Sequence, residues 1–238
     1  MSQTTKSTSD TMRKEDIVRS FYNVPELGQA IFTMYTGIIQ ALCPVVKLQK
    51  APGLTSFVIE LPEKLKVGLQ IGASVAIDGV CLTVTEIEVN KISFDAMQET
   101  LHKTTIGTLK EGDFVNVERS AKMGDEIGGH PMSGHVSTMA KIVAVDESEN
   151  NKVMTFQVEP SWMRCIFSKG FISLDGASLT VVDAQKDAGT FKVWFIPETL
   201  RLTRFGKKQK GDFVNVEIDP QTQVIVETVE RVLTDIKK

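Results

Sequence analysis

Residues 78–84 read Asp-Gly-Val-Cys-Leu-Thr-Val, and residues 175–181 read Asp-Gly-Ala-Ser-Leu-Thr-Val. A second segment, Gly-Asp-Phe-Val-Asn-Val-Glu, occurs identically at 112–118 and at 211–217. The two pairs lie 97 and 99 residues apart, so order and spacing are both preserved. Such a period is too long for one unit of a solenoid and is typical of a whole domain. The chain therefore contains a duplicated domain, and we expect two related but inequivalent pockets.

The composition is typical of a globular protein with a small-molecule partner. Of 238 residues, 42% are hydrophobic and 24% are charged, which is enough to bury two modest cores. The formal net charge is −3, and no long run of Lys or Arg occurs. This balance argues against nucleic acid or an anionic membrane as the partner.

The cysteines and the hydropathy pattern indicate a soluble cytoplasmic protein. Cys43, Cys81 and Cys165 are an odd number at scattered positions, without any Cys-x-x-Cys pair. This pattern fits reduced thiols and predicts neither a disulfide framework nor a zinc site. No apolar run reaches the roughly 18 residues that span a bilayer, and the Ser- and Thr-rich start lacks an apolar signal-peptide core.

Residues 1–33 stand outside the repeat. They read as a polar tail that leads into a short amphipathic helix, because Met12, Ile17, Val18 and Phe21 fall near helical spacing. Two alternatives stay open for this extension. It is a transit peptide, or it is a start-site artefact and the chain proper begins at Met34.

The local signals within each repeat are those of β-strands. Short β-prone runs occur at 75–77, 82–85, 91–94 and 114–117 in the first repeat and at 153–158, 171–174, 179–182 and 191–195 in the second. About six strands in each domain favour closed barrels, because closure removes exposed strand edges. We expect an all-β fold with two tandem Greek-key barrels of six strands, at 34–130 and 131–222. Residues 62–65 and 161–164 supply one short helix in each.

A different pattern follows Pro220. Ile225, Val229, Val232 and Ile236 step by four, three and four residues, which predicts an amphipathic C-terminal α-helix over 223–238. Its apolar stripe either packs back on its own barrel or joins a helix bundle with neighbouring subunits.

Four segments in chain order resemble the α-chain type of riboflavin synthase. They are residues 34–40 (Met-Tyr-Thr-Gly-Ile-Ile-Gln), the 78–84 segment quoted above, residues 125–135 (Asp-Glu-Ile-Gly-Gly-His-Pro-Met-Ser-Gly-His) and residues 218–222 (Ile-Asp-Pro-Gln-Thr). The resemblance runs from Met34 to about Leu233 and departs at Tyr35, where the family usually has Phe. It implies a homotrimeric transferase that converts two molecules of 6,7-dimethyl-8-ribityllumazine into riboflavin and 5-amino-6-ribitylaminouracil. Neither a metal nor an organic cofactor is expected.

The resemblance also implies which residues bind the substrate. In the first repeat these are Thr36, Gly37, Ile38, Cys81, Leu82, Thr83, Asp95, Ala96, Met97, Gln98, Glu99 and Thr100. In the second repeat they are Gly134, His135, Val136, Ser178, Leu179, Thr180, Phe195, Ile196, Pro197, Glu198, Thr199 and Leu200, with Lys169 reaching in from a neighbouring subunit. A pteridine ring edge needs amide and hydroxyl partners, and a ribityl chain needs several polar partners, both of which these segments supply.

Four residues are candidates for catalysis, which requires deprotonation of a methyl group on C7. His135 is the first candidate for acid/base chemistry, because imidazole exchanges protons near neutral pH. Cys81 is a candidate nucleophile or polar contact. Ser178 stands at the matched position of the second repeat, and this difference makes the two pockets inequivalent. Asp219 is a further candidate. His130 is expected to fix the linker between the barrels.

Two alternatives belong to other functional classes. The first is a non-catalytic lumazine- or flavin-binding protein, such as an optical antenna or carrier, whose second pocket would be degraded. The second is a flavin-reductase module, which would need a nicotinamide-binding α/β domain with a Gly-rich fingerprint. The sequence has no such domain and keeps the polar residues of the second pocket, so both features favour the enzyme.

Overall fold

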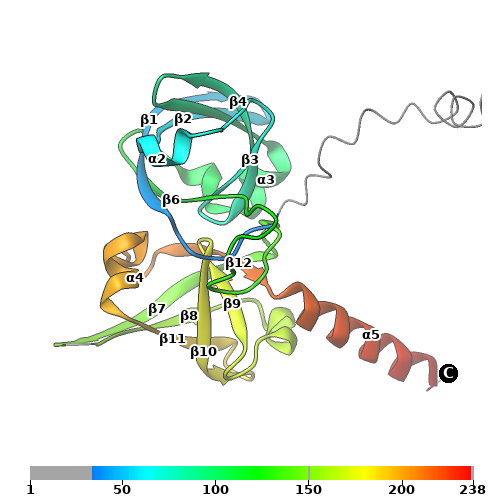
Figure 1. Ribbon diagram of the computed structural model, residues 1–238. Coiled ribbons are helices and arrows are strands. Elements are labelled where there is room, and N and C mark those ends of the chain that lie inside the picture. Colours follow the sequence, from blue (N-terminus) through cyan, green and yellow to red (C-terminus); the bar gives the residue numbers. More distant parts are fainter. Residues whose placement is uncertain (1–33, 150, 237–238) are drawn as a thin grey trace, which may run out of the picture. The chain divides into compact units, whose positions relative to one another are not determined.

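The computed structural model describes residues 34–149 and 151–236 (Figure 1). The helix expected within the N-terminal extension lies outside the described residues. The mostly-β fold, with two six-stranded closed barrels and a C-terminal helix, confirms the expected fold class.

The first barrel closes in the strand order β1-β2-β5-β4-β3-β6, and all its pairs are antiparallel. Its strands are β1 (Ala41–Ala51), β2 (Leu54–Glu60), β3 (Ser74–Ile77), β4 (Val80–Glu88), β5 (Lys91–Met97) and β6 (Phe114–Arg119). Its short helices are α2 (Glu63–Lys66), α3 (Gln98–Lys103) and the 3₁₀ turn η1 (Thr105–Thr108). The expected helix at 62–65 is therefore present as α2.

The second barrel repeats the cyclic strand order, as β10-β11-β8-β7-β12-β9. Its strands are β7 (Thr138–Ser148), β8 (Asn151–Gln157), β9 (Phe171–Leu174), β10 (Ala177–Gln185), β11 (Thr190–Phe195) and β12 (Phe213–Ile218). Its helical elements are η2 (Pro160–Cys165), α4 (Pro197–Leu202), η3 (Arg204–Gly206) and the long C-terminal α5 (Pro220–Ile236). The short helix expected at 161–164 is a 3₁₀ turn, η2, that begins at a proline.

Each barrel has its own apolar core, because alternate residues of its strands point inward. Phe57 and Phe94 stack in the first core with ring centroids 5.7 Å apart, and Phe156 and Phe191 stack in the second at 5.4 Å. Cys43 is buried in the first core and Cys165 in the second.

Matched side chains join the two barrels by exchanged hydrogen bonds. The Asn116 side chain donates to Asp175 O at 2.9 Å, and the Asn215 side chain donates to Asp78 O at 2.8 Å. Each aspartate carboxylate in turn accepts from the backbone N–H of the asparagine in its own barrel, at 2.8 and 2.7 Å. Asp78 also pairs with Arg204 of the second repeat. The two repeated sequence segments therefore build this junction.

Helix α5 leaves most of its apolar side chains uncovered. Its stripe residues Ile225, Val229, Val232 and Ile236 are all exposed. Its attachment to the second barrel uses Val226, which packs against the core, and ion pairs from Arg164. Packing on its own barrel therefore accounts for only a small part of the helix surface.

Candidate functional site

The structure exchanges two of the predicted binding segments between the repeats. Chain order grouped Gly37 with Cys81 and Gly134 with Ser178. Instead, Gly37 O accepts a hydrogen bond from Ser178 N at 2.9 Å, and Gly134 O accepts one from Cys81 N at 2.8 Å. Each candidate pocket thus combines a strand of one barrel with the loop that enters the other barrel.

The packing around these loops agrees with the exchange. Ile39, which follows the first loop, belongs to the core cluster of the second barrel. Val136, which follows the second loop, packs against the core of the first barrel. The correction to the expected grouping therefore applies to whole segments, 36–38 and 134–136.

A buried carboxylate anchors each loop. Glu118 accepts from Thr36 N at 2.7 Å, Thr36 Oγ1 at 2.8 Å and Gly37 N at 3.0 Å. Glu217 accepts in the same way from the backbone and hydroxyl of Ser133 and from Gly134 N. Burial raises the pKa of both carboxyls, although these donors oppose the shift. Sequence analysis missed both residues, although both end the identical repeated segment.

A histidine lies beside Ser178. His130 Nδ1 lies 2.6 Å from Ser178 Oγ, and its ring stacks on Phe171 with centroids 5.1 Å apart. His130 is buried, which lowers its pKa, while the charge of Asp219 opposes that shift. His130 does lie in the linker, as expected, but it also contacts a predicted catalytic residue.

A tyrosine lies beside Cys81 instead. The Tyr35 hydroxyl donates to Cys81 Sγ at 3.2 Å, and the ring is completely buried. Burial, with the nearby Cys81 and two carboxylates, raises the pKa of Tyr35 far above its usual range. The Tyr35 hydroxyl therefore acts as a hydrogen-bond donor to the thiol.

The other two catalytic candidates lie in different settings. The His135 side chain is exposed, and its backbone N–H donates to Ser133 Oγ at 3.2 Å. The carboxylate of Asp219 accepts from Thr222 N at 2.8 Å and from Thr222 Oγ1 at 2.6 Å, which caps the first turn of α5. Catalytic roles for both residues stay predictions.

Some of the other predicted binding residues lie in the barrel cores, and others lie on the surface. Leu82, Leu179, Ala96 and Phe195 are buried in the barrel cores. The side chains that face outward belong to Thr83, Thr180, Asp95, Met97, Gln98, Glu99, Ile196, Pro197 and Glu198, while Thr100, Thr199 and Leu200 are half-buried. The last residues of each segment form a short helix, α3 or α4, that places them at the barrel rim. Glu99 pairs with Lys103 at 2.7 Å and Glu198 with Arg201 at 2.6 Å, which lowers the pKa of both glutamates.

Lys169 occupies a backbone position that favours glycine. Its φ is 68°, and its matched residue in the first repeat is Gly72, with φ 87°. Both amides make the same bond, from Lys169 N to Val181 O at 2.7 Å and from Gly72 N to Val84 O at 2.8 Å. The Lys169 side chain is exposed. Lys169 therefore holds a strained backbone conformation at a position where the first repeat has glycine.

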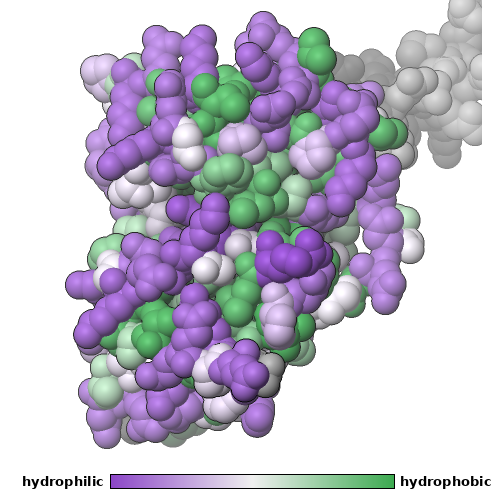
Figure 2. Space-filling model, turned by 90° about the vertical axis from the view of Figure 1, so that its left-hand side faces the viewer, coloured by the Kyte–Doolittle hydropathy of each residue, from purple (hydrophilic) through white to green (hydrophobic). Residues whose placement is uncertain are grey.

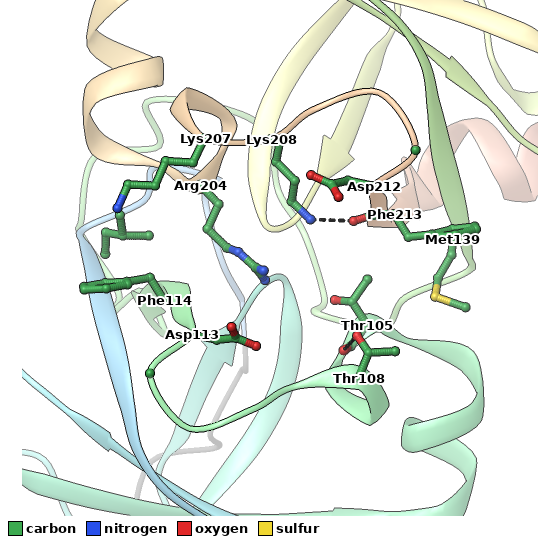
Figure 3. Close-up of a pocket in the computed structure, with 13 residues that line it drawn as sticks. Thr105, Thr108, Asp113, Phe114, Met139, Arg204, Lys207, Lys208, Asp212 and Phe213 are labelled. Atoms are coloured by element: carbon green, nitrogen blue, oxygen red, sulfur yellow. Dashed lines mark hydrogen bonds between the residues drawn. The ribbon is translucent and has the colours of Figure 1, made fainter.

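A large cavity lies away from these residues. It encloses about 660 Å³ between matched residues of the two repeats, namely Thr105 and Arg204, Asp113 and Asp212, and Phe114 and Phe213. Figure 3 shows Arg204 and Thr105 pointing into this space from opposite sides. Figure 2 shows apolar surface gathered in the middle of one face, between hydrophilic side chains above and below.

Predicted binding residues line two smaller cavities. Thr36 and Ile38 line one of about 460 Å³, and Phe195, Pro197 and Leu200 line another of about 390 Å³. In the described part of the chain, no group of three or more His, Cys, Asp or Glu residues is placed to hold a metal ion. Every described helix is too short or too polar to span a membrane.

Comparisons with known proteins agree with the duplication. A family model described as "Lumazine binding domain" matches residues 36–120 and again 133–219. The riboflavin synthase of Escherichia coli strain K12 is 53% identical over 201 residues, covering 84% of this chain and 93% of that protein. The riboflavin synthase of Chlamydia pneumoniae is 44% identical, covering 84% and 97%.

Solved structures of LumP share the fold. LumP complexed with 6,7-dimethyl-8-(1'-D-ribityl) lumazine superposes with a TM-score of 0.71 at 22% identity, covering 78% of this chain and 99% of that one. LumP complexed with riboflavin gives a TM-score of 0.69 at 24% identity. At this identity the likeness extends to the fold alone.

Proposed function

The chain belongs to the riboflavin synthase family, and we propose that it converts two molecules of 6,7-dimethyl-8-ribityllumazine into riboflavin and 5-amino-6-ribitylaminouracil. The observation that supports this reaction best is the pair of matched but chemically unequal pockets, one at Cys81 and one at Ser178. The reaction moves a four-carbon unit between two identical molecules. An enzyme for it must hold two copies together and make one a donor and the other an acceptor.

Each pocket offers the groups that a lumazine needs. Backbone groups of the loops at 36–38 and 134–136 lie beside the strand residues, which suits the polar edge of a pteridine ring. Thr83 and Thr180 are exposed and follow Cys81 and Ser178 by two residues. The carboxylates and hydroxyls at the rim, on Glu99, Thr100, Glu198 and Thr199, are suited to the ribityl chain.

The reaction needs the two pockets to face each other, and we propose that neighbouring subunits supply the partner pocket. The exposed apolar stripe of α5 supports a homotrimer in which three such helices cover one another. Lys169, held in a left-handed conformation, would reach into the pocket of the adjacent subunit. The enzyme acts in the cytoplasm and needs neither metal nor organic cofactor in this proposal.

The mass of the purified protein in solution tests the trimer. Leu233→Glu, on the exposed face of α5, is expected to shift the mass from trimer to monomer while the barrels keep their β spectrum. Val46→Glu, an exposed apolar position on β1, is the matched control. A wild-type monomer would contradict the trimer.

Fluorescence tests the reaction itself. The full chain, incubated with synthetic 6,7-dimethyl-8-ribityllumazine and no added cofactor, is expected to release riboflavin continuously. Tight binding of the lumazine without riboflavin would instead identify a non-catalytic carrier.

A further inference from the structure

The large cavity between the two repeats has matched walls but unmatched charges. Both repeats line it with the same Gly-Asp-Phe segment, at 112–114 and at 211–213. The turn η1 adds two threonines, whereas Arg204 and Lys207 stand at the matched positions of the second repeat. One wall therefore offers hydroxyl groups, and the opposite wall offers cations.

The Arg204 guanidinium has donors left over for a ligand. Its Nη1 pairs with Asp78, whereas Nε and Nη2 make no hydrogen bond to a residue of 34–149 or 151–236. Figure 3 shows the Arg204 side chain extending into the cavity. A guanidinium presents a planar fork of N–H groups that fits the oxygens of a phosphate or carboxylate. The cavity therefore contains a donor group suited to an anion.

Lys207 adds a positive charge on the same side. Its Nζ lies 4.9 Å from the centroid of the Phe114 ring, and it makes no ion pair within the described part of the chain. Lys208, by contrast, is buried, with its Nζ 3.4 Å from a carboxylate oxygen of Asp175. Lys207 is therefore the cation of this wall that is left to pair with an anionic group held by Arg204.

The two aspartates of the lining suit hydroxyl groups. Asp113 Oδ2 accepts from Lys110 N at 2.9 Å, and Asp212 Oδ2 accepts from Gln209 N at 2.9 Å. Their Oδ1 atoms accept no hydrogen bond from a described residue. Each carboxylate thus keeps an acceptor for a hydroxyl group of a ligand.

Apolar side chains supply surfaces for a planar ring. Phe114 is 40% exposed and Phe213 is 48% exposed, and Leu42 and Met139 line the cavity at matched positions. Half-exposed phenyl rings offer faces on which an aromatic ligand can stack. The volume of about 660 Å³ lies within the range of small-molecule sites, which is about 300–1,000 Å³.

We propose that this cavity binds a mononucleotide, a planar heteroaromatic ring joined through a sugar or polyol to a phosphate. The phosphate lies at Arg204 and Lys207, and the hydroxyl groups lie at Asp113 and Asp212. The ring stacks on Phe213, because Lys207 already covers the other phenyl ring. None of the predicted lumazine-binding residues lines this cavity, so the site goes beyond the proposed reaction.

Titration calorimetry of the full chain measures this binding without any lumazine. The probes are flavin mononucleotide, which has a large ring on a ribityl phosphate, and adenosine monophosphate, which has a smaller ring on a ribose phosphate. Riboflavin and adenosine are the matched compounds without phosphate. Comparing each pair isolates the contribution of the phosphate, and comparing the two phosphates shows which ring the cavity prefers.

Three variants test the assigned contacts. Lys207→Thr gives the second repeat the residue type of the first, and Lys207 is exposed, so the fold is expected to persist. Arg204→Lys keeps a positive charge beside Asp78 but loses the planar fork. Phe213→Leu removes the ring. The control is Lys186→Thr, because Lys186 Nζ lies 5.4 Å from the centroid of another phenyl ring and the same charge is removed.

The wild type is expected to bind at least one phosphate probe more tightly than its partner without phosphate, by about tenfold or more, and added salt should weaken this binding. Lys207→Thr and Arg204→Lys are each expected to raise Kd by about 10- to 100-fold, the contribution of contacts with charged groups. Phe213→Leu is expected to raise Kd by about two- to tenfold. Lys186→Thr is expected to match the wild type.

Two results would overturn the proposal. One is equal affinity of the wild type and Lys207→Thr for the phosphate probes, because the probes would then lie elsewhere, including in the lumazine pockets. The other is that neither phosphate probe binds the wild type at millimolar concentration. A chain that makes no riboflavin would refute the proposed function instead, since binding is measured without lumazine.

Discussion

Gly79 and Gly176 lie in direct backbone contact across the two barrels. A Cβ atom built on Gly79 would lie 2.6 Å from Gly176 N, and one built on Gly176 would lie 2.8 Å from Gly79 N. Both residues have positive φ, at 77° and 81°. The repeated Asp-Gly pair therefore serves two purposes, because it turns the β3–β4 and β9–β10 hairpins and lets the barrels approach.

Gly79→Ala is expected to destabilise the protein more than Gly68→Ala. Both glycines have positive φ, so both substitutions cost about 1 kcal/mol for the left-handed backbone. No atom lies within 4 Å of a Cβ built on Gly68, whereas Gly79 meets the other barrel. Urea unfolding should show an additional loss of about 2 kcal/mol at Gly79. Equal losses would mean that the barrel contact is unimportant for stability.

Glu118→Gln is expected to loosen the loop that enters the Ser178 pocket. An amide offers one oxygen where the carboxylate accepts from Thr36 N, Thr36 Oγ1 and Gly37 N. At least one buried N–H then loses its partner, at a cost of about 1–3 kcal/mol in the free energy of unfolding. KM for the lumazine should rise, because Gly37 lies against Ser178. Glu111→Gln, at an exposed carboxylate, is the control, and an unchanged KM in Glu118→Gln would contradict the anchoring role.

Lys169→Gly is expected to lower activity without lowering stability. Glycine relieves the left-handed backbone, so the free energy of unfolding should stay unchanged or rise by up to about 1 kcal/mol. Turnover should fall because the ammonium group is lost. Lys169→Ala should lose the same activity without the gain in stability. Wild-type turnover in Lys169→Gly would show that the side chain has no role in the reaction.

Asp78 makes stability depend on pH. Burial raises the pKa of its carboxyl from 3.8 to about 6, although the Arg204 guanidinium opposes this shift. Between these two values the folded chain holds a proton that the unfolded chain has lost, so the free energy of unfolding falls as pH rises. Asp78→Asn should remove this contribution and leave a shallower decline between pH 4 and pH 6. Asp187→Asn, in an exposed turn, should keep the wild-type slope, and an equal slope in Asp78→Asn would contradict the raised pKa.

The fold was predictable from the sequence because its signals are local. The runs around Ile92 and Phe191 alternate with the strand period, the run at 75–77 is wholly apolar, and Asp-Gly pairs mark the hairpins. The strands β1, β2, β7 and β12 were not among the runs singled out. The outer ends of β1 and β7 carry charged residues and are exposed. The α5 helix was predicted from its stripe, but it begins at Pro220 and not at residue 223 as predicted.

The sequence allowed us to list the residues of the candidate site, but it did not show which of them lie together. Gly37 and Ser178 are far apart in the sequence, so chain order placed each loop with its own repeat, and only the closed barrels show the exchange. Glu118 and Glu217 looked like ordinary strand ends, because their hydrogen-bond partners lie more than 80 residues away. His130 stands in the linker, and its contact with Ser178 depends on the path of that linker.

The central claim is that the two pockets hold two copies of one substrate for a single exchange, and a mass balance tests it most directly. A known amount of 6,7-dimethyl-8-ribityllumazine is consumed by the full chain, and both products are quantified by chromatography. The account predicts one riboflavin and one 5-amino-6-ribitylaminouracil for every two lumazines lost. Loss of lumazine in any other ratio, or its binding without either product, would contradict the account.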